Sequence, residues 1–297
     1  MPSQGMGNPP RIVLPTPAPW PYRSPMDDAR ASTALALLAD LGLPADEAAV
    51  LHASNTFTLR IRPADVVARI APRDRAEDLA VELERAEALQ AVGAPVGPPE
   101  PRLAATVHLR GEHAITLWQH LPAQGRAELP PAQYSAALAA LHAGMRALDL
   151  PVPPLADRVG HALALLQDPA RTPALAPTDR SLLQETLTRL TGRAATGGPQ
   201  QILHGEPHPG NVLDTPAGPR FIDLETFCRG LIEFDLAHAP AEVAAHYPGH
   251  DPALLEGCRT LSLALATTWR FDREDTFPDG RAIGEAWLAE VRARVEG

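Results

Sequence analysis

The chain of 297 residues contains no lysine, since all 26 of its Lys and Arg positions are arginines. This absence excludes mechanisms that depend on a lysine amine, such as Schiff-base chemistry with pyridoxal phosphate. It also excludes a Walker A loop, whose phosphate contact is a lysine. A side chain that carries positive charge to a phosphate in this protein is therefore expected to be an arginine, with its planar fork of donors.

The chain also has few cysteines, no net positive charge and no long apolar run. Cys228 and Cys258 are too few for a disulfide framework and lack the spacing of metal ligands. A net charge of −10 provides no basic surface, so we expect no nucleic acid among the partners. No apolar run approaches the ~18 residues of a membrane span, and no signal-peptide pattern is present. We therefore expect no membrane partner and a cytoplasmic protein, and the sequence gives no indication of its oligomeric state.

The pattern along the chain changes twice. Residues 1–25 hold eight prolines and little periodicity, which predicts a disordered, proline-rich tail. Up to residue 121 the periodicity predicts helices over 26–43 and 75–92, and strands over 48–52, 56–62, 66–70, 102–108 and 114–120. Beyond it the spacing predicts helices over 131–148, 156–166, 179–191, 251–268 and 284–295, with small strands between 201 and 223. The N-terminal part is therefore α+β, and the remainder is mainly helical.

The most informative segment is LHGEPHPGNVL at 203–213, followed by FIDLE at 221–225. Its prolines and glycines predict a non-helical loop between apolar strands. If the strands on either side of 214–219 pair as a hairpin, Asn211 and Asp223 lie close together at its open end. Their hard oxygen atoms suit Mg²⁺. Glu206 would then lie near the metal, where its carboxylate could accept a proton from a bound hydroxyl.

This segment resembles the catalytic and metal-binding segments of the kinase-like aminoglycoside phosphotransferase family. The resemblance implies an α+β, two-lobed protein-kinase-like fold, with a small β-rich N-lobe over 26–121 that binds nucleotide. A larger, mainly helical C-lobe over 122–297 would carry the catalytic loop and bind the acceptor. The implied reaction transfers the γ-phosphoryl group of ATP to a hydroxyl of a small molecule, with Mg²⁺ as cofactor. By resemblance Asn211 and Asp223 hold the metal, and Asp235 supports the loop.

The N-terminal half resembles the same family. Ser54 and Asn55 lie where the family places a nucleotide-covering loop, although from the residues alone they fit a simple turn as well. Arg69 resembles the strand cation that contacts the ATP phosphates, and Glu82 resembles the helix glutamate that pairs with it. From its position alone Arg69 also fits a surface arginine. Leu117–Gln119 resembles the hinge, where backbone groups would bind adenine.

Two histidines of the loop have more than one interpretation. His204 fits a hydrogen-bonding brace better than a catalyst, and His208 fits either a brace or a contact to substrate. The order His-Gly-Glu-Pro-His is superficially similar to a zinc-protease motif. That motif requires a helix, which Gly205 and Pro207 oppose.

Glu206 departs from the family, which usually has Asp at this position. The extra methylene could displace the carboxylate by about an ångström, and such a displacement can reduce turnover ~10²-fold. This departure motivates an alternative function, a nucleotide-binding pseudokinase or sequestering protein without transfer activity.

The acceptor is left open between an aminoglycoside-like compound and a metabolite. The acidic run Asp272–Asp279 fits either a solvated loop or a wall that binds a cationic substrate. His238, His246 and His250 follow the loop and are expected to be solvated surface residues.

Overall fold

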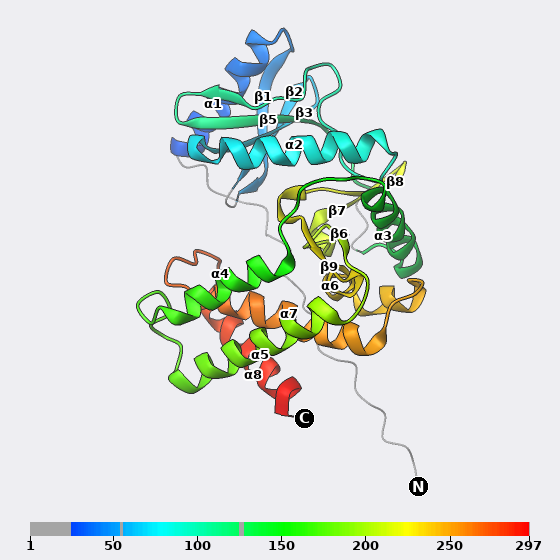
Figure 1. Ribbon diagram of the computed structural model, residues 1–297. Coiled ribbons are helices and arrows are strands. Elements are labelled where there is room, and N and C mark those ends of the chain that lie inside the picture. Colours follow the sequence, from blue (N-terminus) through cyan, green and yellow to red (C-terminus); the bar gives the residue numbers. More distant parts are fainter. Residues whose placement is uncertain (1–24, 54–55, 125–127, 297) are drawn as a thin grey trace. The chain divides into compact units, whose positions relative to one another are not determined.

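The computed structural model describes residues 25–53, 56–124 and 128–296 (Figure 1). Its chain divides into two compact units. The first unit contains the chain up to Ala76 together with Thr106–His120, and the second contains Glu77–Ala105 and everything from Leu121 onward. Ser54, Asn55 and nearly all of the proline-rich tail lie outside the described residues.

The first unit is built on a five-stranded antiparallel sheet in the order β1-β2-β3-β5-β4. Helix α1 (Pro25–Asp40) precedes β1 (Ala45–Ala53), β2 (Phe57–Pro63), β3 (Val66–Pro72), β4 (His108–Arg110) and β5 (His113–Gln119). In β2 and β3 every second side chain is buried, including Leu59, Ile61, Ala68 and Ile70. This alternation places one face of the sheet against the core.

The strand predicted over 102–108 is wrong, because only His108–Arg110 forms β4. Upstream of it, the carboxylate of Glu100 accepts hydrogen bonds from the backbone and the guanidinium of Arg102. The amide of Leu103 donates to the carbonyl of Glu100 at 3.2 Å. These bonds close a turn, which removes the amides of this segment from any strand pairing.

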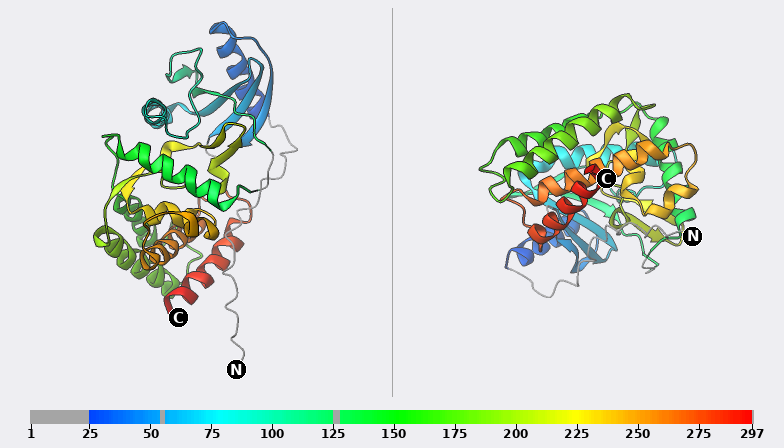
Figure 2. Two further views of the ribbon diagram at one scale, coloured as in Figure 1. Left: turned by 90° about the vertical axis from the view of Figure 1, so that its right-hand side faces the viewer. Right: turned by 90° about the horizontal axis from the view of Figure 1, so that it is seen from below.

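The second unit is mainly helical, and the helical character predicted for the chain beyond residue 121 is confirmed. Its helices are α2 (Ala76–Ala91), α3 (Pro131–Arg146), α4 (Leu155–Gln167), α5 (Pro177–Thr196), α6 (Ile232–His238), α7 (Pro252–Arg270) and α8 (Gly280–Glu296). Helix α7 packs against α4, α5, α6 and α8, and α5, α7 and α8 lie side by side in Figure 2. Asp251 caps α7 by accepting from the amides of Ala253 and Leu254, and Pro252 occupies its first turn.

Two small sheets interrupt these helices. Strands β7 (Val212–Thr215) and β8 (Gly218–Phe221) form the predicted hairpin, and β6 (Gln201–Leu203) pairs with β9 (Cys228–Gly230). Short 3₁₀ turns occupy Arg73–Arg75, Pro209–Asn211, Leu224–Thr226 and Ala241–His246. The two sheets bring residues 201–230 together as one folded segment.

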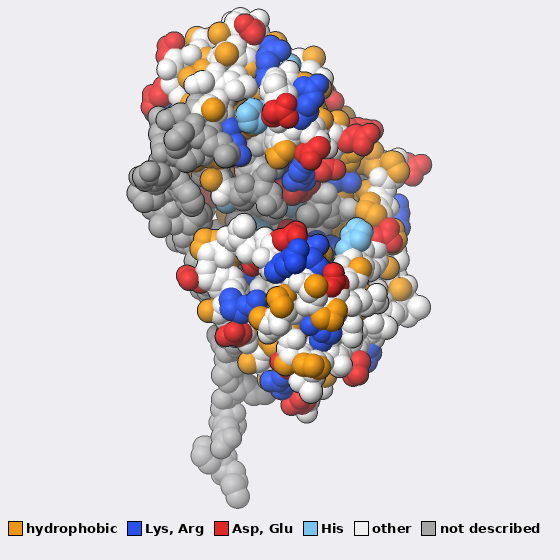
Figure 3. Space-filling model, turned by 90° about the vertical axis from the view of Figure 1, so that its left-hand side faces the viewer, with side chains coloured by type: hydrophobic (Ala, Val, Ile, Leu, Met, Phe, Trp, Pro, Cys, Tyr) orange, Lys and Arg blue, Asp and Glu red, His pale blue; other side chains and the backbone are white. Residues whose placement is uncertain are grey.

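The surface and the helices give two further observations. None of the described helices combines the length and the apolar character needed to cross a bilayer. On the face shown in Figure 3, acidic and basic side chains are interspersed over the described part of the surface.

Candidate active site

The backbone of the loop after β6 is fixed from two sides. Gly205 has a φ of 91°, and a Cβ there would collide with the carbonyl oxygen of Thr226, so only glycine fits. The carboxylate of Asp235 accepts from the amide of His204 at 2.9 Å and from that of Gly205 at 2.8 Å. Tyr134 donates its hydroxyl to the carbonyl of Pro207. These contacts set the position of Glu206 between them.

Asp235 is itself held in a buried network. His142 Nε2 lies 2.9 Å from Asp235 Oδ2, and His142 Nδ1 lies 2.7 Å from the hydroxyl of Tyr247. Burial opposes ionisation of Asp235, but the hydrogen bond from His142 and the neighbouring donors outweigh it, so the pKa of the carboxyl lies below its ordinary value. The network therefore stabilises the charged carboxylate of Asp235, which accepts the two hydrogen bonds from the loop amides.

The three residues expected to carry the chemistry belong to one hydrogen-bonded segment. Asn211 Nδ2 donates to the carbonyl of Glu206 at 3.0 Å. The amide of Ile222, the residue before Asp223, donates to the carbonyl of Asn211 at 3.0 Å. Asp223 has φ 64° and ψ 65°, a left-handed conformation that turns the chain out of the hairpin. The fold thus holds a carboxylate, an amide and a second carboxylate in one hydrogen-bonded segment.

The two loop histidines make internal contacts. His204 is fully buried; its Nε2 lies 3.1 Å from the carbonyl of Ile222, and its Nδ1 accepts from the amide of Glu206 at 3.4 Å. Burial lowers the pKa of His204, which favours the neutral ring these contacts require. His208 Nδ1 accepts from the amide of Gly210 at 3.0 Å, and burial also lowers its pKa.

Sequence reasoning missed Arg158, which belongs to α4. Its Nη2 donates to Glu206 Oε1, and its Nη1 lies 3.4 Å from the carbonyl of Gly205. Burial opposes ionisation of Glu206, but the charge of Arg158, its hydrogen bond and the neighbouring histidines together outweigh it, so the pKa of the carboxyl lies below its ordinary value. The side chain of Glu206 is still 31% exposed.

Helix α2 is attached to the segment that follows Asp223. Glu82 is buried, and its Oε1 accepts from the amide of Leu224 at 3.1 Å. Arg85, also missed from the sequence, donates to the carbonyls of Leu224 and Glu225 at 2.8 and 2.9 Å and lies over the ring of Phe227. Glu84 and Glu87 of the same helix are exposed. One face of α2 thus fixes the chain directly after the second carboxylate.

The remaining nucleotide candidates lie in the first unit. Arg69 is half-buried on β3, paired with Thr58 of β2 and Thr116 of β5, on the opposite face from Ala68 and Ile70. Leu117 is buried on β5, and Gln119, the last residue of that strand, is exposed. That Arg69, Leu117 and Gln119 contact a nucleotide stays a prediction.

The expectation that His238 is solvated is wrong. Its Nδ1 lies 2.8 Å from the carbonyl of Phe234, and its Nε2 lies 3.0 Å from the hydroxyl of Ser262. Burial is the main influence on this ring and lowers the pKa of His238 to about 4. His246 is exposed, as expected, and His250 is half-buried.

The acidic run at 272–279 is largely neutralised. Arg171 contacts Asp272 at 2.6 Å and Glu274 at 3.2 Å, and Arg270 contacts Asp275 at 2.9 Å. The paired carboxylates give little support to the interpretation of this run as a wall for a cationic substrate.

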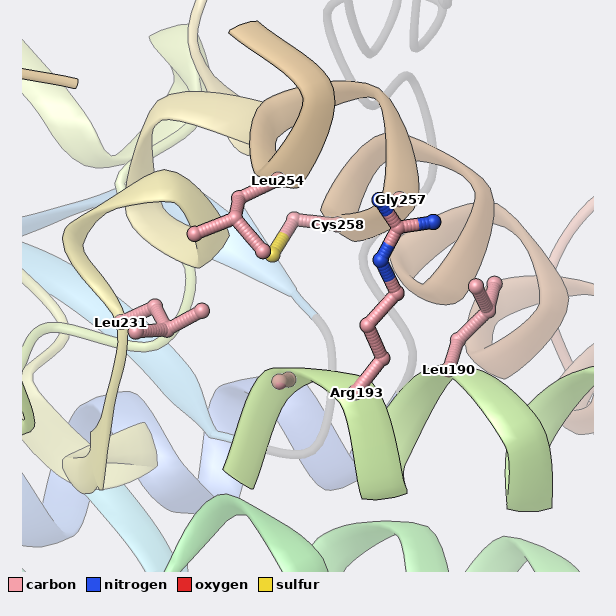
Figure 4. A pocket seen from close by; sticks show the side chains of 7 residues that line it. Leu190, Arg193, Leu231, Leu254, Gly257 and Cys258 are labelled. Atoms are coloured by element: carbon pink, nitrogen blue, oxygen red, sulfur yellow. The ribbon is translucent and has the colours of Figure 1, made fainter. Parts of the chain in front are cut away.

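A small pocket between α5 and α7 (Figure 4) does not belong to the site. It is lined mainly by apolar side chains, including Leu190, Leu231, Leu254 and Cys258. Its volume is about 10 Å³, which is at the lower limit for a single water molecule. It is too small to hold an acceptor.

The sequence profile described as the phosphotransferase enzyme family (APH) matches residues 48–282, most of the chain. The chain belongs to this family. The predicted family is therefore confirmed, and the protein is a small-molecule phosphotransferase. No curated protein sequence matches it.

Several solved structures of kinases and phosphotransferases are similar in fold to this phosphotransferase. Amicoumacin kinase hAmiN, in complex with AMP-PNP, Ca²⁺ and Ami, matches with a TM-score of 0.68 at 11% identity, over 91% of this chain and 96% of that one. A choline/ethanolamine kinase family protein from Mesorhizobium loti matches with a TM-score of 0.64 at 20% identity, over 92% and 95%. The GDP complex of wild-type aminoglycoside 2'-phosphotransferase-IIIa matches with a TM-score of 0.65 at 15% identity, over 89% and 98%. These matches confirm the predicted α+β, protein-kinase-like fold.

Proposed function

We propose that this phosphotransferase moves the γ-phosphoryl group of ATP to a hydroxyl of a small molecule. The observation that carries the proposal is the hydrogen-bonded segment that links Glu206, Asn211 and, through Ile222, Asp223. A carboxylate that orients a hydroxyl and two oxygen ligands that hold a cation are the groups that phosphoryl transfer needs from a protein.

In this proposal Glu206 orients the acceptor hydroxyl and accepts its proton. Arg158 occupies Oε1, and the partial exposure of the side chain allows Oε2 to meet a substrate. The lowered pKa of Glu206 makes it a weak base. A weak base suffices, because the transition state of phosphoryl transfer is loose and depends mainly on positioning and charge neutralisation.

The residues present suit Mg²⁺. Asn211 uses its Nδ2 toward the carbonyl of Glu206, so its amide oxygen would be one ligand of the cation, and the carboxylate of Asp223 would be the other. Among the described residues no group of three or more His, Cys, Asp or Glu forms a metal cluster. Mg²⁺ takes one or two protein ligands together with phosphates and water, so Asn211 and Asp223 would be enough to hold it. When bound, the ion would neutralise charge on the transferred phosphate.

The nucleotide contacts are proposed for the first unit. Arg69 would bind phosphate oxygens, and the backbone of Leu117–Gln119 would bind adenine. Strand β4 pairs with His113–Ile115 of β5 and extends no further along it. Strand β4 therefore does not occupy the backbone groups of Leu117–Gln119 that would bind adenine. Since AMP-PNP and GDP accompany two of the similar structures, we propose ATP and include GTP in the test.

A screen for the acceptor tests the proposal. The protein would be incubated with Mg²⁺ and γ-³²P-labelled ATP or GTP and a panel that includes kanamycin, choline, homoserine and neutral polyols. We expect one class to be phosphorylated well above the rate for water, and the neutralised run at 272–279 favours an acceptor without several positive charges. Tight Mg-ATP binding with no labelled product from any acceptor would instead support the pseudokinase alternative.

A further inference from the structure

The carboxylate of Glu206 has one hydrogen-bond partner among the described residues, and it is Arg158. Every other hydrogen bond at Glu206 involves its backbone: its carbonyl accepts from Asn211 and His208, and its amide donates to His204. The backbone of Glu206 itself is therefore held by other residues, and Arg158 adds one long bond to the neighbouring carbonyl of Gly205, whereas the carboxylate depends on Arg158 alone.

Arg158 is well placed to hold that carboxylate. It belongs to the first turn of α4, which is anchored in the core by the buried side chains of Leu155 and Val159. Just before the helix, the carbonyl of Pro153 accepts from the amide of Arg229 at 2.8 Å, which fixes the start of α4 to β9. A guanidinium on such a support presents donors in a fixed plane.

We propose that Arg158 is a positioning residue that holds Glu206 Oε1 so that Oε2 is directed to the acceptor hydroxyl. The proposal rests on the proposed function, in which Glu206 meets that hydroxyl. It also explains how the chain accommodates glutamate in place of the usual aspartate. The longer side chain has one more rotatable bond, and the ion pair with Arg158 selects one of the conformations that this bond allows.

A double-mutant cycle on thermal unfolding, without nucleotide, tests the pair itself. Arg158→Gln should lower Tm by several degrees in the wild type and by much less in the Glu206→Gln background. Arg229→Gln, which removes an exposed arginine from β9, is the control and should lower Tm equally in both backgrounds. Equal losses for Arg158→Gln in both backgrounds would overturn the pairing.

The same cycle on turnover, with the acceptor found in the screen, tests the positioning role. Arg158→Gln should reduce kcat ~10- to 100-fold, the size of effect expected from a misplaced catalytic group. Nucleotide affinity should be unchanged, and Arg158→Lys should retain more turnover than Arg158→Gln because it keeps the charge. In the Glu206→Gln background the substitution of Arg158 should cause no further loss.

The outcomes separate the two proposals. If Glu206→Gln retains full turnover, the proposed function of Glu206 fails. If Glu206→Gln loses turnover while Arg158→Gln retains it, or if the losses of the two variants multiply, only the positioning role fails.

Discussion

At the scale of single residues, the candidate site depends on a few residues. Some of these could be recognised from the sequence and others could not. Glu206, Asn211 and Asp223 could be selected because they share a short motif. Arg158 could not, because it lies 48 residues before Glu206 and no spacing rule connects them. His238 was assigned to the surface because a single histidine in sequence carries no sign of burial. Residues that act through tertiary contacts are therefore the ones that sequence patterns miss.

Gly205 gives a prediction that separates steric conflict from backbone strain. Gly205→Ala should destabilise the protein by about 3 kcal/mol or more, because it adds a collision with Thr226 to an unfavourable φ. Gly218→Ala is the matched control, since Gly218 has a φ of 96° but open space around it. It should lose only about 1 kcal/mol. Urea unfolding of both variants measures the difference, and equal losses would contradict the steric account.

His238 gives a prediction about pH. Its pKa is lowered from 6.5 to about 4 in the folded state, mainly by burial, with Glu206 opposing and Arg158 reinforcing the shift. Between these values the unfolded chain binds the proton more readily, so stability should rise with pH across this window, by on the order of 3 kcal/mol. His238→Asn should flatten this part of the stability profile measured by urea unfolding. An unchanged slope from pH 4 to 6.5 would contradict the shift.

At the scale of elements, long periodic segments and the local hairpin were predicted well, and the pairing of short strands far apart in the sequence was not. The helical spacing located most of the long helices within a few residues, and the β7–β8 hairpin followed from the turn between two apolar strands. Strands β6 and β9 are three residues each and pair across a long loop, so no local pattern predicts them together. The strand expected over 102–108 failed because Glu100 and Arg102 close a turn there.

The attachment of α2 to the segment after Asp223 gives an element-scale prediction. Arg85→Gln should destabilise the protein by about 2 kcal/mol, because the buried carbonyl of Leu224 and the partly buried carbonyl of Glu225 lose a charged donor. It should also weaken Mg-ATP binding, since the chain next to the proposed metal ligand is released. Glu87→Gln, on the exposed face of α2, is the control and should leave both unchanged. Urea unfolding and isothermal titration with Mg-ATP measure the two effects.

At the scale of the whole molecule, the fold could be predicted because family motifs and helical periodicity agree over most of the chain. The missing lysine, a property of the entire sequence, is the reason why an arginine, Arg69, is proposed as the phosphate-binding cation of the first unit. A ligand that binds the folded chain and not the unfolded one stabilises the fold, so the binding of Mg-ATP should stabilise the folded protein as a whole.

Metal dependence of that stabilisation is a whole-molecule prediction. ATP with Mg²⁺ should raise Tm of the wild type more than ATP with EDTA does. Asp223→Asn should abolish this difference without unfolding the protein, because asparagine tolerates the left-handed conformation at this position. If the difference persists in Asp223→Asn, as measured by scanning fluorimetry, Asp223 is not a metal ligand.

The most direct test of the account is single-turnover transfer of the γ-phosphoryl group from Mg-ATP to the identified acceptor, by the wild type and by Glu206→Gln. We predict that the wild type forms phosphorylated acceptor and that Glu206→Gln forms it ~10²-fold more slowly or not at all, while both bind Mg-ATP equally. Equal rates of transfer would remove Glu206 from the reaction, and no transfer by the wild type to any acceptor would contradict the proposed function.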